Sequence, residues 1–319
     1  MKEKLFLLFL GCLIPLFCTI TEPVTFEIET GYREDYLNWK SLTDDDLELL
    51  EYKETYKGLQ YWQSNLLIRS ITRDFYLEIE GGYGGLINGD MHQKYANQSF
   101  TNDDFKASYN VIRGNDWNAE GVIGMLVNLT PERFTKLILI PKLGYSSWWR
   151  IIYTDNPSPL SLTVSDNIYD DDSIIVFSMN RRRLKQVWYG PTIGGGLQIN
   201  PNNKVILKAN YMFHWMKVDN KAEASYRRYY GSEDRLADIM ENFHADDIKA
   251  YGHVGKISAS YGISDKFRLG IGGRFQYYSS YIRNYTYEKF ETMTQENSLR
   301  RYVSRWWYIS GFITAGIAF

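Results

Sequence analysis

The C-terminal stretch SRWWYISGFITAGIAF, residues 304–319, decides the fold because its side chains alternate in character. Small or polar residues occupy one parity, with Phe312 as the exception. Apolar residues occupy the other parity: Trp307, Ile309, Ile313, Ala315, Ile317 and Phe319. A period of two is the spacing of a β-strand, whose successive side chains point to opposite faces. The chain therefore ends in a strand with one apolar face.

The last residue of this strand carries information about location. A terminal aromatic such as Phe319 resembles the end by which bacterial outer-membrane barrels are recognised for insertion. We therefore expect Phe319 to act as the insertion signal read by the barrel assembly machinery. The apolar parity that it closes is expected to contact outer-membrane lipid.

The N-terminus has the features of a secretory signal peptide. Lys2 and Lys4 precede an apolar run at residues 5–17, and small or polar residues follow. This order predicts export, whereas a transmembrane helix needs about 20 apolar residues. A lipoprotein site at Cys12 is the weaker alternative, because it leaves an apolar stub at the mature end. We predict a signal peptide at residues 1–21 and a barrel domain at residues 22–319, without a disulfide because both cysteines lie in the signal.

Composition narrows the classes of partner and cofactor. The formal net charge is −2 and both signs are mixed along the chain, so no overall field favours nucleic acid. The 26 tyrosines and nine tryptophans suit the aromatic girdles of a membrane barrel. The acidic runs at residues 44–46 and 170–172 lack the spaced ligands and glycine of a calcium loop, so no metal or other cofactor is predicted.

Short turns and long connections alternate along the chain. Turn-forming residues occur at 72–74, 130–133, 201–203 and 264–266, and long polar connections at 41–47, 91–105, 154–181, 220–246 and 288–296. This rhythm predicts about ten strands, with the short turns in the periplasm and the long loops outside. Within residues 220–246, a short helix capped by Ser232 is expected to carry Leu236, Ile239, Met240 and Phe243 on one face.

The expected strands also have two different faces. In residues 267–281, Phe267, Leu269 and Ile271 alternate with Arg268, Gly270 and Gly272. A soluble β-sandwich also alternates, but it places the apolar parity inside. Strand length, the export signal and Phe319 favour an all-β, closed antiparallel transmembrane barrel.

If the apolar parity faces lipid, the other parity faces the lumen. The charged residues that we expect there are Glu78, Glu80, Glu120, Lys136, Lys142, Lys208, Lys256, Arg268 and Arg274. A barrel of about ten strands is only slightly wider than one that side chains fill. The mixed charges therefore indicate either a plug of ion pairs or a narrow pore with little ion selectivity.

The predicted topology and loop spacing resemble the omptins, ten-stranded outer-membrane proteases, over nearly the whole mature chain. Omptins carry Asp-x-Asp in the second outer loop and Asp-x-His in the fourth, which together activate a water molecule. Here Asn88-Gly89-Asp90 replaces the first pair, and no histidine follows Asp219 at the second. An amide is not a base, so the resemblance implies the fold without the endopeptidase activity, and we predict no enzyme.

Size, tyrosine richness and architecture also resemble the Protochlamydia outer membrane protein family, which implies a porin-like role. We therefore expect a porin-like or surface structural protein, with adhesion or partner binding as a further alternative. Arg181-Arg182-Arg183 is expected to meet lipopolysaccharide phosphates or an acidic outer loop. The pairs Trp148-Trp149 and Trp306-Trp307 are expected in the aromatic girdles.

Overall fold

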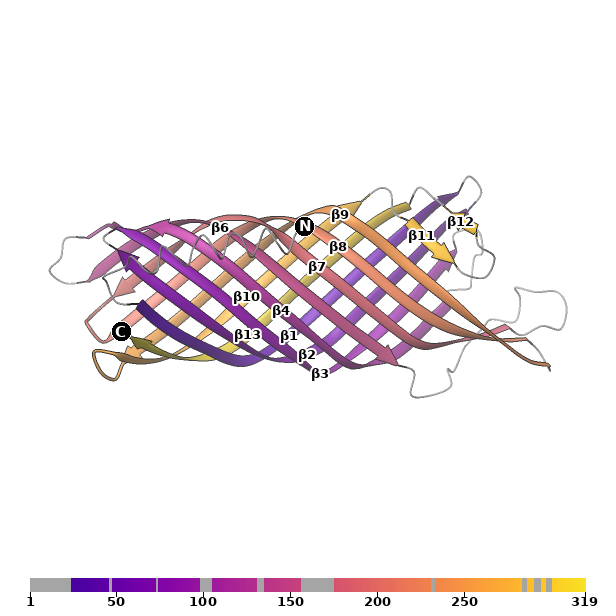
Figure 1. Cartoon of the computed structure of the whole chain (residues 1–319), viewed down its shortest axis with the longest axis horizontal. Helices are drawn as coiled ribbons and strands as arrows, with labels where there is room; N and C mark the ends of the chain where they lie inside the picture. The colour runs from indigo at the N-terminus through magenta and orange to yellow at the C-terminus, as the bar shows by residue number, and fades with distance from the viewer. Residues whose placement is uncertain are drawn as a thin grey trace.

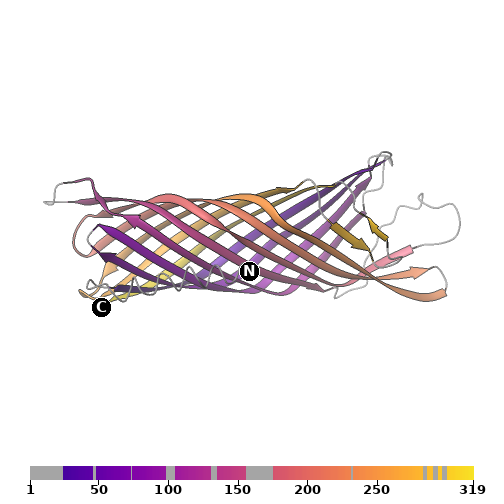
Figure 2. The same cartoon turned by 45° about the horizontal axis from the view of Figure 1, so that its top comes forward.

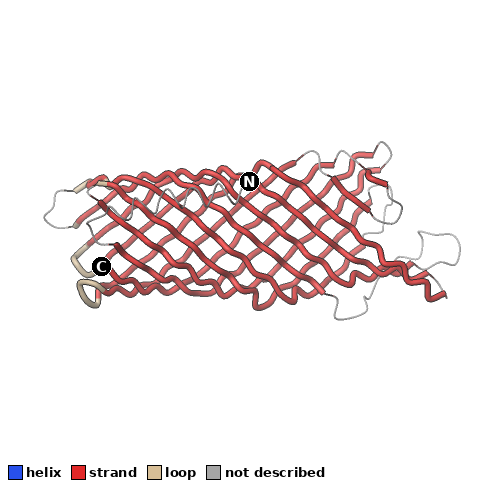
Figure 3. Tube along the Cα trace, in the orientation of Figure 1, coloured by secondary structure: helices blue, strands red, loops and turns tan. Residues whose placement is uncertain are grey.

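The computed structural model describes residues 24–45, 48–72, 74–97, 105–130, 135–155, 175–230, 233–282, 286–289, 294–296 and 300–319. The signal peptide predicted at residues 1–21 lies outside this part of the chain. Every regular element within the described ranges is a β-strand (Figure 3). Those ranges contain no helix that is long and apolar enough to cross a membrane.

Ten long strands form the wall of the molecule in the described part of the chain (Figure 1). They are β1 (Val24–Asp45), β2 (Glu48–Thr72), β3 (Phe75–Asn97), β4 (Phe105–Met125), β6 (Lys136–Asp155), β7 (Ile175–Asn200), β8 (Val205–Tyr230), β9 (Glu233–Gly262), β10 (Phe267–Ile282) and β13 (Arg300–Ala318). Three short strands accompany them: β5 (Val127–Asn128), β11 (Thr286–Lys289) and β12 (Thr294–Glu296).

The sheet closes on itself through the strand that the C-terminal sequence predicted. β13 pairs antiparallel with β1 on one side and with β10 on the other, and β10 also pairs with β9. The amide of Phe319 donates to the carbonyl of Val24 at 3.0 Å, so the pairing continues to the last residue. The prediction of a closed antiparallel barrel is confirmed. Closure satisfies the backbone groups of every wall strand, which a membrane requires.

The barrel has one end with short turns and one end with long extensions. At the short end the Asn202 side chain accepts hydrogen bonds from the amides of Lys204 and Val205, at 2.9 and 2.8 Å. The Ser264 hydroxyl accepts one from Phe267 N at 3.0 Å. The C-terminus lies at this same end (Figure 1). Short turns are periplasmic in outer-membrane barrels, which orients the molecule.

At the other end, two predicted loops are largely strand. β8 continues to Tyr230 and β9 begins at Glu233. The ends of these two strands form the orange hairpin that projects in Figure 2. The helix predicted after Ser232 is therefore wrong, because Tyr226 pairs with Ile239 and Ser225 with Met240 in the β8–β9 ladder. Hydrogen bonding to an existing strand edge outweighs the local helical spacing. β3 likewise continues to Asn97, inside the loop predicted at 91–105.

Aromatic side chains bound an apolar outer band. At the periplasmic end the rings of Phe26 and Phe319 meet at 5.7 Å. At the other limit Tyr36 stacks on Trp307 with ring centroids 5.5 Å apart, and Tyr83 lies 4.5 Å from Trp117. We call this second layer the outer belt and the barrel below it the membrane section. Each strand spends about ten residues between the two layers, which is what a tilted strand needs to cross.

Beyond the outer belt, in what we call the projecting section, the polarity of the wall reverses. On β8 the outward residues become Lys217 and Lys221, whose side chains are about half exposed. Residues of the opposite parity on β8 are buried in the interior: Met216, Val218 and Ala222. The strands thus leave the membrane and continue as a barrel with an apolar interior.

The outer belt contains only part of the predicted aromatic pairs. Trp307 faces outward with 37% of its surface exposed, whereas Trp306 is 1% exposed and Trp148 is 3% exposed. Neighbouring residues of a strand point to opposite faces. One tryptophan of each of these pairs therefore belongs to the barrel interior and not to a girdle.

Candidate functional site

Inside the membrane section, four buried charged side chains bridge the lumen. Lys256 Nζ lies 2.5 Å from Glu29 Oε1, and Arg274 Nη2 lies 2.5 Å from Glu80 Oε1. Glu29, Glu80 and Arg274 are at most 6% exposed. They come from β1, β3, β9 and β10, which surround the lumen. Charges of both signs therefore meet across the interior and neutralise one another.

A second layer of charges lies at the level of the outer belt. Arg33 Nε lies 2.6 Å from Asp35 Oδ1, because residues two apart on β1 point to the same face. Arg33 also pairs with Asp116, and Arg150 pairs with Asp35. Trp306 Nε1 donates to Asp35 Oδ2 at 3.0 Å. None of the four charged side chains is more than 2% exposed. Removing any one of them leaves a buried charge without its full set of partners.

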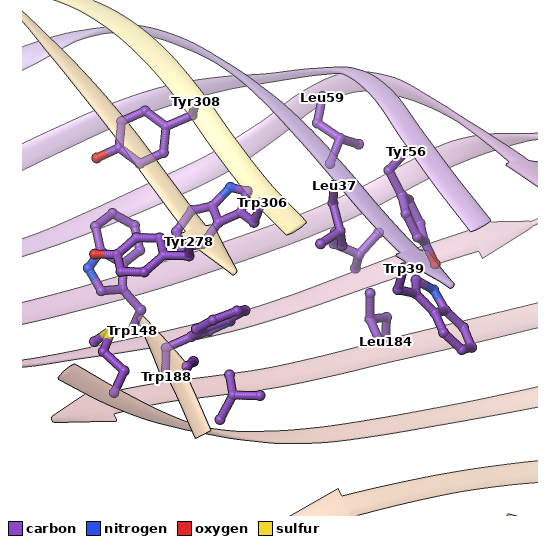
Figure 4. Close-up of a cluster of buried hydrophobic side chains, with 14 of the residues drawn as sticks. Leu37, Trp39, Tyr56, Leu59, Trp148, Leu184, Trp188, Tyr278, Trp306 and Tyr308 are labelled. Carbon is purple, nitrogen blue, oxygen red and sulfur yellow. The ribbon is translucent and has the colours of Figure 1, made fainter. Parts of the chain in front are cut away.

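Aromatic rings close the space around this layer. The Arg33 guanidinium carbon lies 4.2 Å from the Tyr61 ring centroid, and that of Arg150 lies 4.0 Å from the Trp306 ring. Trp306 stacks on Tyr278 with centroids 5.0 Å apart and meets Trp148 at 5.3 Å. Tyr61 belongs to β2, and the other three rings, from β6, β10 and β13, lie near one another inside the barrel (Figure 4). They pack against one another and against the two arginines inside the barrel at this height.

Apolar side chains continue the filling into the projecting section. Leu37, Leu59 and Leu184 are at most 2% exposed and lie together in Figure 4. Farther out, Arg182 pairs with Glu54, and the indole of Trp39 donates to the same carboxylate. The interior therefore remains occupied well beyond the outer belt.

The arginine run on β7 does not form one cluster. Arg182 is 4% exposed and faces the interior, whereas Arg183 faces outward and lies 3.7 Å from Glu223. The side chain of Arg181 lies outside the described part of the structure. Arg182 thus pairs with Glu54 inside the barrel, and not with the acidic outer loop or the lipopolysaccharide phosphates that the sequence left as alternatives.

The charged residues expected in the lumen occupy several heights. Glu80, Lys256 and Arg274 belong to the first ion-pair layer. Glu78 and Lys142 lie nearer the periplasm, with 3.7 Å between Lys142 Nζ and Glu78 Oε1. Four more residues were expected in the lumen. Lys208 and Arg268 line a cavity at the periplasmic end, Lys136 is exposed at the start of β6, and Glu120 lies 4.0 Å from His214.

The charges at the level of the outer belt were not among the expected lumen residues. Arg33 and Asp35 stand two apart on one strand, and Asp116 and Arg150 face them from β4 and β6. The alternation of charge with apolar residues in residues 24–40 is the pattern from which Arg33 and Asp35 are identifiable. The pairing of Asp35 with Arg150 cannot be read from neighbouring residues, because it joins strands on different sides of the lumen.

A serine, a histidine and a glutamate also meet inside the barrel. Ser146 Oγ lies 3.0 Å from His214 Nδ1, and His214 Nε2 lies 4.0 Å from Glu120 Oε1. Tyr278 OH lies 3.2 Å from the same Nδ1 atom. Ser146 is 0% and His214 is 1% exposed, so no substrate reaches the hydroxyl. The arrangement is a buried polar network that links β4, β6, β8 and β10.

The positions that correspond to the omptin carboxylates are not brought together. Asp90 is exposed between buried Gly89 and Met91, and Asn88 is exposed beside it. Asp219 lies on the outer face of β8 and accepts a hydrogen bond from Asp247 N at 2.9 Å. β4, β6 and β7 separate the two strands in the wall, so the carboxylates point away from each other. The described residues also contain no group of three or more His, Cys, Asp or Glu side chains that could hold a metal ion.

Comparison with solved structures agrees with this architecture. The outer-membrane protease OmpT of Escherichia coli superimposes with a TM-score of 0.57 and 11% sequence identity, covering 94% of this chain and 99% of that one. The toluene transporter TodX of Pseudomonas putida aligns with a TM-score of 0.26 and 10% identity, covering 95% and 92% of the two chains. At these identities the first likeness shows the fold alone. No curated protein matches the chain.

Sequence comparison with protein families covers nearly all of the barrel. The model of the family described as Protochlamydia outer membrane protein matches residues 27–319, from near the start of β1 to the terminal phenylalanine. The match includes every wall strand and both charged layers. The chain therefore belongs to the Protochlamydia outer membrane protein family and is an outer-membrane β-barrel protein.

Proposed function

We propose that this protein is a closed, non-conducting barrel that acts as a surface structural protein of the outer membrane. In this role the membrane section anchors the chain, and the projecting section carries the outer connections above the lipid. Family membership and architecture support a location in the outer membrane. The filled lumen distinguishes this proposal from a porin-like role.

The observation that carries the proposal is the layer of Arg33, Asp35, Asp116 and Arg150. These side chains are ion-paired to one another and packed against Tyr61 and Trp306. An ion that passes this layer has to separate buried charge pairs, and each separation leaves a charge without solvent or partner. A permanently open path for solutes therefore conflicts with the packing of the described residues.

Planar-bilayer recording tests the proposal. The purified full chain is expected to insert without discrete conductance steps in 1 M KCl. As a control, the double variant Trp148→Ala, Trp306→Ala removes two rings from the filled layer and is expected to give small steps. Discrete steps from the unmodified protein, at the same protein density, would contradict the closed barrel and favour a porin.

The proposal includes no peptidase activity, because Asp90 and Asp219 both lie on the outer face of the wall, on strands that β4, β6 and β7 separate. Detergent-purified protein is expected to leave a fluorogenic dibasic peptide intact. Turnover that disappears in Asp90→Ala would overturn this part of the proposal and restore the endopeptidase hypothesis.

A further inference from the structure

The periplasmic end of the lumen contains a cavity of about 390 Å³. Residues of the β9–β10 turn, including Asp265, and Ala318 near the C-terminus line its mouth. Farther inside, its walls include the apolar side chains of Ile140 and Ile206 and the ammonium-bearing side chain of Lys208. We call this space the periplasmic chamber. It is blind, because the Glu29–Lys256 and Glu80–Arg274 pairs close the lumen beyond it.

Glu27 and Glu78, the two glutamates of the chamber, already have partners. Arg69 pairs with both Glu27 and Glu78, and Tyr76 OH donates to Glu78 Oε2 at 2.6 Å. Lys142 Nζ lies 3.7 Å from Glu78 and donates to Asn210 Oδ1 at 2.9 Å. Two carboxylates thus face Arg69 and Lys142, and both negative charges are balanced before Lys208 is considered.

Lys208 is a cation of the chamber with which neither of these carboxylates forms an ion pair, whereas Arg268 donates to the backbone carbonyls of Asn203 and Lys204. Among the described residues, no carboxylate oxygen lies within the 4.0 Å of an ion pair from Lys208 Nζ. The backbone of Lys208 is held between two neighbouring strands, where it pairs with Gln198 of β7 and Ser258 of β9. A partly enclosed ammonium without an ion-pair contact is costly, and an anion from the periplasm can supply that contact.

We propose that the periplasmic chamber binds a small organic anion, with its carboxylate or phosphate on Lys208 and its apolar body against Ile140 and Ile206. The volume lies within the range of about 300–1,000 Å³ that is usual for small-molecule sites. Mostly apolar walls with a few well-placed polar or charged groups are also typical of such sites. This site is independent of the closed barrel, because an anion can bind Lys208 whether or not the lumen beyond the chamber conducts.

Calorimetric titration of the full chain in nanodiscs of zwitterionic lipid tests the proposal. The probe is hexanoate, with hexanol and hexylammonium as uncharged and cationic matches and empty nanodiscs as the reference. Hexanoate is expected to bind one per chain, more tightly than either match. Lys208→Met is expected to weaken hexanoate binding about tenfold, because hydrogen bonds to charged groups are stronger than neutral ones. Lys208→Arg is expected to retain binding.

Two further variants keep the outcome unambiguous. Lys204→Met removes an exposed lysine of the neighbouring turn and is expected to leave hexanoate affinity unchanged. Ser260→Phe places a ring in the chamber and is expected to exclude the ligand while Lys208 remains. Heat-modified gel mobility confirms that each variant is folded. Absence of hexanoate binding by the unmodified protein, or equal binding by folded Lys208→Met, overturns the proposal, whereas the conductance result bears only on the closed lumen.

Discussion

The membrane section and the projecting section are built from the same strands but with opposite polarity. Below the outer belt, Ile271 faces lipid with 66% of its surface exposed, while Glu80 and Arg274 pair inside. Above it, Lys217 faces outward and Leu184 is buried inside. The medium outside the wall explains the difference. Lipid accepts only apolar side chains, whereas water drives apolar side chains into the interior.

The largest expected effect comes from opening the ion-paired layer between the two sections. Arg33→Met removes the partner that Asp35 and Asp116 share and leaves both carboxylates buried. We expect the free energy of unfolding to fall by about 3–5 kcal/mol. Guanidinium unfolding in phospholipid vesicles, followed by tryptophan fluorescence, measures this change.

Arg183→Met is the matched control, because Arg183 is 42% exposed on the outer face and its pair with Glu223 is solvated. We expect this variant to lose less than about 1 kcal/mol. Equal losses in the two variants contradict the conclusion that buried pairing holds the layer together.

The second largest effect is expected from a charge placed on the outer face of the wall, which should destabilise the membrane section but not the projecting section. Ile271→Lys introduces an ammonium near the middle of the lipid-facing band, and we expect a loss of about 2–4 kcal/mol. The reverse exchange above the belt, Lys221→Ile, is expected to stay within about 0.5 kcal/mol because that surface is solvated. A comparable loss in both variants, by the same unfolding assay, is evidence that lipid reaches the projecting section.

The smallest expected effect tests the apolar interior of the projecting section. Ile152 is 1% exposed, so Ile152→Val is expected to cost about 0.5–1.5 kcal/mol. Ile309 faces lipid with 58% exposed, and Ile309→Val is expected to cost less than about 0.5 kcal/mol because lipid fills the space. Indistinguishable unfolding midpoints for the two variants argue against a tightly packed interior above the belt.

Several features of the fold were predictable from local alternation. Trp307, Ile313 and Phe319 share one face because a strand has a period of two, and the structure places that face outward. The short turns at 201–203 and 264–266 followed from their residue types. These features depend on neighbours in the chain, so a single sequence contains them.

Other features depended on partners distant in the sequence. The extension of β9 to Glu233 rests on pairing with β8, which outweighs the helical spacing of Leu236 and Ile239. The sequence predicts a girdle position for the pair Trp306-Trp307, and this is wrong for Trp306, which is 1% exposed. Its true position follows from contacts with Asp35 and Tyr278 across the lumen.

By itself the sequence determined the barrel class, its approximate strand number and the lipid-facing parity, because periodicity and turn chemistry are local properties. Tertiary structure alone decided which of the inward charges pair with one another. The answer rests on Arg33, Asp116 and Arg150, which lie far apart in the chain and become partners only when ten strands close. Only this closure shows that the inward charges neutralise one another, and that Lys208 faces its chamber without an ion-pair contact of its own.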